Sequence, residues 1–197
     1  MSQKHSHTTA DYIPWETAMN LIRRLYKDGH YRASLLIGCG CFFGTRISDT
    51  LALNWETILN KPSFSLVEKK TGKYREIKIN AGFQEHIRDC HKAMGVTDDT
   101  RPCFLNRFGG VISVQSVNKE LKWIGVRYQV RVSHLSTHSL RKTWARKIYD
   151  NENAAGRGEL ALLKLSELLN HSSPAISRAY IGLRRQELGE VYDNLVF

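Results

Sequence analysis

The amino-acid sequence predicts a mainly α-helical protein with a small antiparallel β-sheet, which is an α+β fold. Apolar residues recur at helical spacing along most of the chain, and one pair of segments with alternating polarity stands between the helical stretches. With 197 residues, of which 42% are hydrophobic and 24% charged, the chain can build one domain with a substantial core or two small ones. We expect residues 1–10 to be a disordered segment and residues 11–197 to form a single domain.

Two helices are predicted in the first part of the chain. The first starts near Pro14 and ends at Gly29, with apolar residues at helical spacing between them. Residues 31–43 are apolar on most sides, which predicts a helix that is buried in the core. Gly44 ends this second helix, and residues 51–53 are expected to begin a short new one.

Residues 64–68 and 75–79 alternate in polarity around Thr71 and Gly72, which is typical of a β-hairpin. Four basic residues surround its turn: Lys69, Lys70, Lys73 and Arg75. A charged turn is usually only solvated. The functional alternative is a lysine that reaches a phosphate on a mobile arm.

Further helices are predicted in the second half of the chain. They are expected over residues 83–94, 117–128, from a cap at Ser136 or Thr137 onward, 162–169, and from Pro174 to Tyr180. The long connection 97–110 and the polar segment 151–158 are expected to be loops.

Lysines and arginines outnumber acidic residues by 29 to 19, which gives a net charge of +10. This excess favours a polyanionic partner, either nucleic acid or an acidic membrane surface, and the alternative is that the charge serves only solubility. Nucleic acid is the favoured partner, because the basic residues are spread over many elements instead of one tail. The longest apolar run, residues 33–43, is too short and too rich in glycine to cross a bilayer.

None of the four cysteines forms a Cys-x-x-Cys pair, and no Cys/His cluster has the spacing of zinc ligands. Cys39 and Cys41 lie in an apolar run and are expected to be free thiols in the core. This composition is typical of a reducing cytoplasm, and the first ten residues lack the apolar region of a signal peptide. We expect a cytoplasmic protein without a metal or another cofactor.

Three short motifs follow each other along the chain: Arg46-Ile-Ser-Asp49, His138-x-x-Arg141, and Leu169-Asn170-His171 with Tyr180 nine places on. Each motif alone is weak, and for Arg46 alone an ion pair with Asp49 is the simpler explanation. The ordered set, with a lysine-rich hairpin between the two arginines, resembles the tyrosine recombinase (phage integrase) family. The resemblance runs from about Pro14 to the C-terminus, and it implies the catalytic-domain fold of that family for residues 11–197.

Cleavage of a phosphodiester by a tyrosine requires these residue types. The unperturbed pKa of tyrosine is about 10, so its hydroxyl is a poor nucleophile near neutral pH. Attack on phosphorus builds negative charge on two non-bridging oxygens, which guanidinium groups bind with a fork geometry that lysine lacks. The resemblance implies that Arg46 and Arg141 are this clamp, and that Tyr180 becomes linked to the 3′ phosphate.

The resemblance also implies roles for the other residues of the site. His138 is expected to assist proton transfer at the tyrosine, and His171 to donate a hydrogen bond to a phosphate oxygen. Lys70 is expected to protonate the leaving 5′ oxygen, with its neighbouring turn lysines as close alternatives. Asp49 either orients the site from behind or is only the acidic residue at a helix N-terminus. The side chains expected to bind DNA are Lys69, Lys73 and Arg75.

The function that the resemblance implies is that of a site-specific recombinase or integrase, which forms a 3′-phosphotyrosyl DNA intermediate without metal or ATP. Two alternatives use the same scaffold: a type IB topoisomerase and a non-catalytic DNA-binding regulator. Relaxation of supercoils without recombinant product would indicate the topoisomerase. A biological effect that survives Tyr180→Phe would indicate the regulator.

Two features depart from the family pattern. Asn170 stands where the family commonly has glycine, and asparagine tolerates the left-handed backbone. Most relatives carry an N-terminal DNA-binding domain before the catalytic domain. We expect this chain to be either a catalytic fragment or a naturally short enzyme, and in both cases to bind DNA weakly and with strong dependence on salt. The resemblance implies two partners, which are double-stranded DNA and further copies of the chain. We expect the chain to be a monomer when it is free and a tetramer on DNA. The apolar tail 188–197 is expected to dock on a neighbouring protomer, or alternatively on its own domain.

Overall fold

The computed structural model of the protein describes residues 10–193, except for the side chains at positions 184, 185, 188, 190 and 192. This part of the chain is mainly helical and has one two-stranded antiparallel sheet, which confirms the predicted fold class. Of the expected segment 1–10, residues 1–9 lie outside the described residues. The elements are α1 (Trp15–Lys27), α2 (Tyr31–Phe43), α3 (Ile47–Thr50), α4 (Trp55–Ile58), β1 (Ser63–Val67), β2 (Tyr74–Lys78), α5 (Ala81–Ala93), α6 (Val114–Arg127), α7 (Thr137–Ala154), α8 (Gly158–Leu169), α9 (Pro174–Tyr180) and α10 (Leu183–Asp193).

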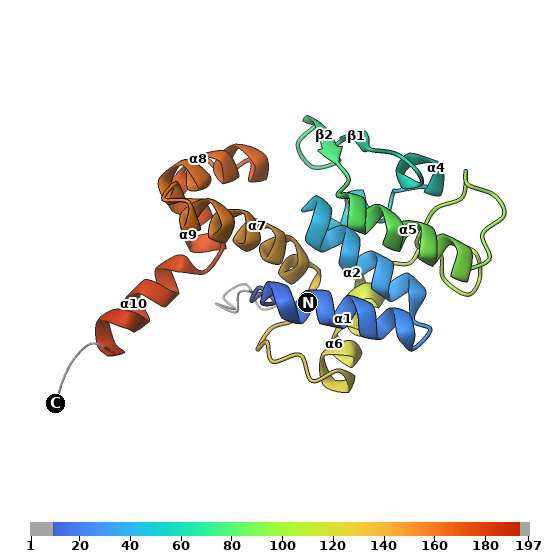
Figure 1. Cartoon of the computed structure of the whole chain (residues 1–197), viewed down its shortest axis with the longest axis horizontal. Helices are drawn as coiled ribbons and strands as arrows, with labels where there is room; N and C mark the ends of the chain where they lie inside the picture. Colours follow the sequence, from blue (N-terminus) through green and yellow to red (C-terminus); the bar gives the residue numbers. More distant parts are fainter. Residues whose placement is uncertain (1–9, 194–197) are drawn as a thin grey trace.

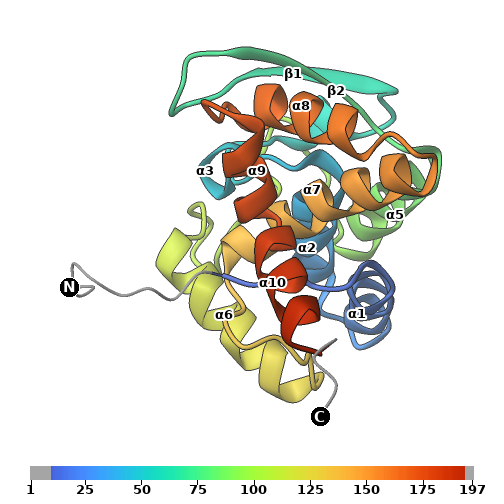
Figure 2. The same cartoon turned by 90° about the vertical axis from the view of Figure 1, so that its left-hand side faces the viewer.

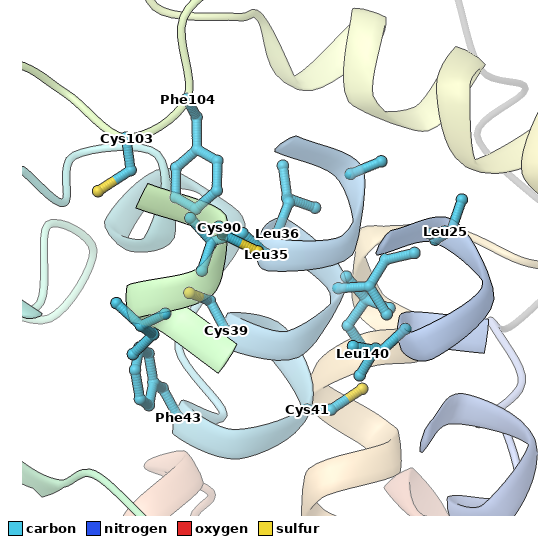
Figure 3. Close-up of a cluster of buried hydrophobic side chains, with 14 of the residues drawn as sticks. Leu25, Leu35, Leu36, Cys39, Cys41, Phe43, Cys90, Cys103, Phe104 and Leu140 are labelled. Carbon is cyan, nitrogen blue, oxygen red and sulfur yellow. The ribbon is translucent and has the colours of Figure 1, made fainter. Parts of the chain in front are cut away.

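Helix α2 is the centre of the main core, and α1, α5 and α7 pack around it (Figure 1). Its apolar sequence is buried on nearly all sides, and Cys39 and Cys41 are free thiols with no exposed surface, as predicted. Figure 3 shows Cys39 and Cys90 on one side of α2, and Cys41 and Leu140 on the other. Burial of each large aliphatic or aromatic side chain in this core contributes about 1.5–3 kcal/mol.

Two glycines allow the neighbouring helices to approach α2 closely. A Cβ at Gly38 would lie 2.4 Å from the Phe83 ring of α5, and a Cβ at Gly40 would lie 2.6 Å from Leu140 of α7. These distances are shorter than a van der Waals contact between carbon atoms, so a larger residue at either position would push the neighbouring helix away from α2. The position of α7, which carries two of the predicted site residues, therefore depends on Gly40.

Strands β1 and β2 form the predicted hairpin, with Phe64 opposite Ile77 and Leu66 opposite Arg75. Both strands begin and end one residue earlier than predicted. The reason is that Glu68 belongs to the turn, since its carbonyl accepts the N–H of Gly72 at 2.8 Å.

Helix α7 connects the main core with a second, smaller one. Helix α8 packs against α7, and α9 packs against α8 (Figure 2), and a separate apolar cluster is buried there. The buried residues of this cluster are Ala145, Leu165, Leu169, Ile181 and Leu183. Helix α10 then extends away from the rest of the molecule (Figure 1). Among the helices of the described chain, none combines the length and the apolar composition that crossing a membrane requires.

Two segments were assigned the wrong kind of structure. The short helix expected from residues 51–53 ends before them, because α3 already starts after Arg46 and the buried residues 51 and 53 lie in the turn that follows. The loop expected over residues 151–158 is mostly helix, because α7 continues through residue 154. Gly156, which has a φ of +73°, follows two residues later and ends the helical conformation.

Candidate active site

Side chains that the sequence analysis assigns to catalysis line one open cavity of about 410 Å³. The cavity lies between α3, the turn of the β1–β2 hairpin, the first turn of α7 and the α8–α9 connection. The six side chains are Arg46, Lys70, His138, Arg141, His171 and Tyr180. Residues from distant parts of the sequence therefore face the same space.

The turn between α2 and α3 positions both arginines. Gly44 ends α2 with a φ of +60°, a left-handed conformation that glycine adopts without strain, and Arg46 follows as the N-cap of α3. A side chain would not fit at position 44, because its Cβ would lie 2.1 Å from the Trp144 ring. Arg141 Nη1 donates a 2.7 Å hydrogen bond to the Gly44 carbonyl, so this turn also holds the second arginine.

The hairpin turn carries Lys70, which is exposed at the rim of the cavity. Asp49 of α3 is buried and holds this turn from behind, since its Oδ1 accepts the N–H of Lys69 at 3.0 Å. The carboxylate thus ties α3, which follows Arg46, to the residue that precedes Lys70.

His138 and Arg141 lie on the first turn of α7, as predicted. A capping box starts this helix: the Ser136 hydroxyl accepts the N–H of Ser139, and the Ser139 hydroxyl accepts the N–H of Ser136. The cap fixes the first turn and with it the direction of the His138 and Arg141 side chains. Desolvation lowers the pKa of His138, and the charges of nearby lysines and of Arg141 lower it further, so the imidazole is neutral near pH 7.

His171 follows the residue that ends α8. Asn170 has a φ of +58°, so it adopts the left-handed conformation expected at this position. His171 Nδ1 lies 2.9 Å from the hydroxyl of Ser177, which is fully buried, and Nε2 is therefore the nitrogen available to a ligand. Desolvation, followed by the charges of Arg141 and Arg46, lowers the pKa of His171.

Tyr180 is the last residue of α9, which has Ser173 as its N-cap and Pro174 at its first position, as predicted. The Tyr180 ring packs edge-on against the His171 ring, with 5.1 Å between the centroids. Lys142 Nζ lies 5.0 Å from the centroid of the same ring. The nucleophile predicted from the sequence is therefore half-buried and held from two sides.

Burial raises the pKa of Tyr180. The charges of Arg141 and Arg46, and a hydrogen bond with Arg141, oppose this rise without cancelling it. The hydroxyl is therefore protonated near neutral pH. A proton acceptor is needed before its oxygen can attack an electrophile.

Glu68 belongs to this site, although no sequence motif points to it. Its buried carboxylate lies 2.5 Å from Arg46 Nη1, 3.3 Å from Arg75 Nη1 and 3.9 Å from Arg141 Nη1. The alternation along the hairpin could have identified it, because Glu68 follows Phe64 by four residues and therefore lies on the same inward face. A carboxylate on an inward face requires buried cationic partners.

The three side chains predicted to bind DNA have two different placements. Lys69 and Lys73 stand on the exposed turn, and Lys73 Nζ donates to the Asn170 side chain. Arg75 instead points inward to Glu68, because the alternation along β2 puts position 75 on the inward face. A role for these side chains in DNA binding stays a prediction.

A helical domain with one small hairpin, which gathers these side chains around one cavity, defines the class of tyrosine recombinase catalytic domains. Solved structures that share the fold include two Xer recombinases. XerA recombinase has a TM-score of 0.67 and 17% identity, over 96% of this chain and 67% of that chain. XerH site-specific recombinase, bound to a palindromic difH substrate in a post-cleavage complex, has a TM-score of 0.66 and 22% identity, over 98% and 55%. The chain belongs to the phage integrase family, whose sequence profile matches residues 16–187.

Tyrosine recombinase XerC of Chromobacterium violaceum is similar in sequence. It is 27% identical over 166 residues, which cover 84% of this chain and 52% of XerC. The chain thus spans about half the length of this relative.

Proposed function

We propose that this chain is a site-specific DNA recombinase or integrase, in which Tyr180 forms a 3′-phosphotyrosyl intermediate with double-stranded DNA. The observation that carries this function is the cavity of about 410 Å³, where the side chains that such a reaction needs face one space. Membership in the phage integrase family and the names of XerC and XerH support it. The net charge of +10 suits the same partner. We place this activity in the cytoplasm, where free buried thiols such as those of this chain stay reduced.

In the proposed reaction, Arg46 and Arg141 bind the two non-bridging oxygens of one phosphodiester. Their side chains are only 22% and 7% exposed, so the surrounding protein holds both guanidinium groups in place. Donors that are oriented before the reaction stabilise the charge of the transition state without reorganising. His171 Nε2, oriented through Ser177, is the third donor to the phosphate.

Two proton transfers accompany the cleavage. His138, neutral because its pKa is lowered, accepts the proton of the Tyr180 hydroxyl as the phenolic oxygen bonds to phosphorus. The bond from phosphorus to the 5′ oxygen breaks, and Lys70 donates a proton to that oxygen. The phosphotyrosine retains the energy of the phosphodiester, so the 5′ hydroxyl of a partner strand reverses the same steps and rejoins the DNA.

Recombination further requires several protomers, and we expect a monomer in solution and a tetramer on DNA. Arg146 donates a hydrogen bond to Gln186, and Arg178 forms an ion pair with Glu187, so the first half of α10 is bound within its own chain. The predicted docking segment 188–197 starts beyond these contacts, and its residues 194–197 lie outside the described residues. Deletion of residues 190–197 should prevent tetramer formation on DNA while single protomers still bind. Intact tetramers in a gel-shift assay would contradict docking in trans.

A suicide-substrate assay tests the chemistry. The substrate is a pool of short duplexes with randomised sequence and one nick, so that cleavage releases a small fragment and the covalent product accumulates. The wild-type protein should give a protein–DNA band that survives denaturation and disappears after protease treatment. Tyr180→Phe should give none. Sequencing of the captured DNA identifies the recognised site.

Tyr149→Phe is the matched control, because Tyr149 lies on α7 and its hydroxyl bonds to Asn153. This variant should give the wild-type yield. A covalent band with Tyr180→Phe would assign the nucleophile to another residue. The absence of a band with DNA that the protein demonstrably binds would refute the proposed reaction.

A further inference from the structure

Glu68 places a negative charge beside a cavity that is lined with cations. The side chain is 2% exposed, and both of its oxygens accept hydrogen bonds. Oε2 accepts from Arg46 Nη1 at 2.5 Å and from the Thr71 hydroxyl at 2.7 Å, and Oε1 accepts from Arg75 Nη1 at 3.3 Å. A buried carboxylate is costly unless it is paired, and these partners satisfy it.

Three guanidinium groups, those of Arg46, Arg75 and Arg141, lie within 3.9 Å of this carboxylate. They repel one another. Besides burial, the charges of Arg46 and Arg75 lower the pKa of Arg141, and Glu68 opposes this shift. Burial would raise the pKa of Glu68, but hydrogen bonds from Thr71 and Arg46 and the arginine charges lower it. Glu68 is therefore ionised near neutral pH and offsets the repulsion between the arginines.

The same carboxylate reaches the turn that carries Lys70. The Thr71 hydroxyl, next to Lys70, donates to Oε2, and the Gly72 N–H donates to the Glu68 carbonyl at 2.8 Å. Arg46 also donates to Oε2. One oxygen atom thus joins an arginine of the proposed clamp to the turn that holds the proposed acid.

We infer that Glu68 is a positioning residue, which sets the Arg46 guanidinium and the Lys70 turn relative to each other before a phosphate binds. This role rests on the proposed function. Glu68 does not bind the phosphate, because a carboxylate beside a phosphate would repel it and both Glu68 oxygens are already bonded. It acts through Arg46 and Thr71. Removal of its charge should therefore slow cleavage without weakening DNA binding.

Glu68→Gln keeps the size of the side chain and removes the charge. Single-turnover cleavage of nicked duplex, measured against DNA concentration, separates the maximal rate from the half-saturating concentration. We expect the maximal rate to fall about tenfold to hundredfold. This decrease is smaller than the decrease of about 10²–10³ that follows removal of an oxyanion donor, because Arg46 is displaced but still present. The half-saturating concentration should stay constant or fall, because a negative charge near the DNA is lost. Thr71→Val, which removes one hydrogen bond and leaves the arginines paired, should reduce the rate less.

Glu76→Gln is the matched control, because it removes the same charge from an exposed position of the same hairpin, and it should cleave like the wild type. A merely structural role of Glu68 would reduce the fraction of active protein but not its rate. A folded Glu68→Gln variant with a maximal rate within about twofold of the wild type would overturn the inference.

A second measurement does not depend on cleavage. In a crystal structure of Glu68→Gln, the Arg46 guanidinium should leave the position that it has beside the carboxylate. An unchanged Arg46 would overturn the positioning role. If the wild type itself fails to cleave DNA that it binds, the proposed function fails, and this structure still decides what Glu68 does.

Discussion

Replacement of Arg141 by lysine tests the proposed arginine clamp directly. Arg141 Nη1 donates to the Gly44 carbonyl at 2.7 Å, and the guanidinium also reaches the Tyr180 hydroxyl. Lysine keeps the charge but has a single terminal nitrogen, so it cannot satisfy the carbonyl and bind a phosphate with fork geometry. Because the charge is unchanged, any loss of activity reports the geometry.

Arg141→Lys should cause two losses of different size. In the reaction, one missing donor to the developing charge costs about 2.7–4 kcal/mol, which is a decrease of about 10²–10³ in the cleavage rate. In the folded protein, the buried Gly44 carbonyl loses its partner, which should lower the free energy of unfolding by about 1–3 kcal/mol. The effect on catalysis should therefore exceed the effect on stability.

Single-turnover cleavage of nicked duplex measures the first loss, and urea unfolding followed by tryptophan fluorescence measures the second. Arg157→Lys is the control, because the Arg157 side chain is 53% exposed and pairs with Glu152 outside the cavity. If Arg141→Lys cleaves within about threefold of the wild-type rate, fork geometry is not required and the reasoning about the clamp is wrong.

Three further predictions concern the residues around the clamp. Gly44→Ala should lower the free energy of unfolding, measured in urea, by about 2–5 kcal/mol. A left-handed alanine costs about 1–2 kcal/mol, and its contact with the neighbouring indole costs about 1–3 kcal/mol more. A loss below about 1 kcal/mol would contradict this. Ser177→Ala should slow cleavage about fivefold, because the hydrogen bond that orients His171 contributes about 1 kcal/mol, and an unchanged rate would show that His171 needs no such partner. The cleavage rate should fall as the pH drops through the pKa of His138, which lies below its usual value, because a protonated imidazole cannot accept the tyrosine proton. Lys142→Met removes a charge that lowers this pKa, so it should move the acid limb of the pH–rate profile to higher pH, and an unmoved limb would exclude His138 as the titrating group.

Elements with strong local signals were predicted well. Helix α2 has the bounds expected from residues 31–43, and α9 runs from Pro174 to Tyr180 as expected. Apolar periodicity, a proline in a first turn and a glycine at a helix end act within a few residues of chain, so they can be recognised without the fold.

Elements without such signals were predicted less well. Helix α3 has only four residues, too few for a period to show, and its start depends on the turn at Gly44 against Trp144. The polar residues 151–153 are typical of a loop, but polar residues are equally common on an exposed helix face, so α7 continues beyond the end that the sequence predicts.

The amino-acid sequence was sufficient to predict the fold class, the family resemblance, and the types and order of the residues that line the cavity. Chemistry selects residue types, and their order along the chain can be recognised without coordinates. Which of these side chains contact one another became known from the packing of the folded chain. Glu68 lies far in sequence from Arg46 and Arg141, and a strand alternation says that a carboxylate points inward but not which cations it finds there. Such contacts depend on how separate helices and a hairpin pack, and packing is set by the burial of all their side chains together.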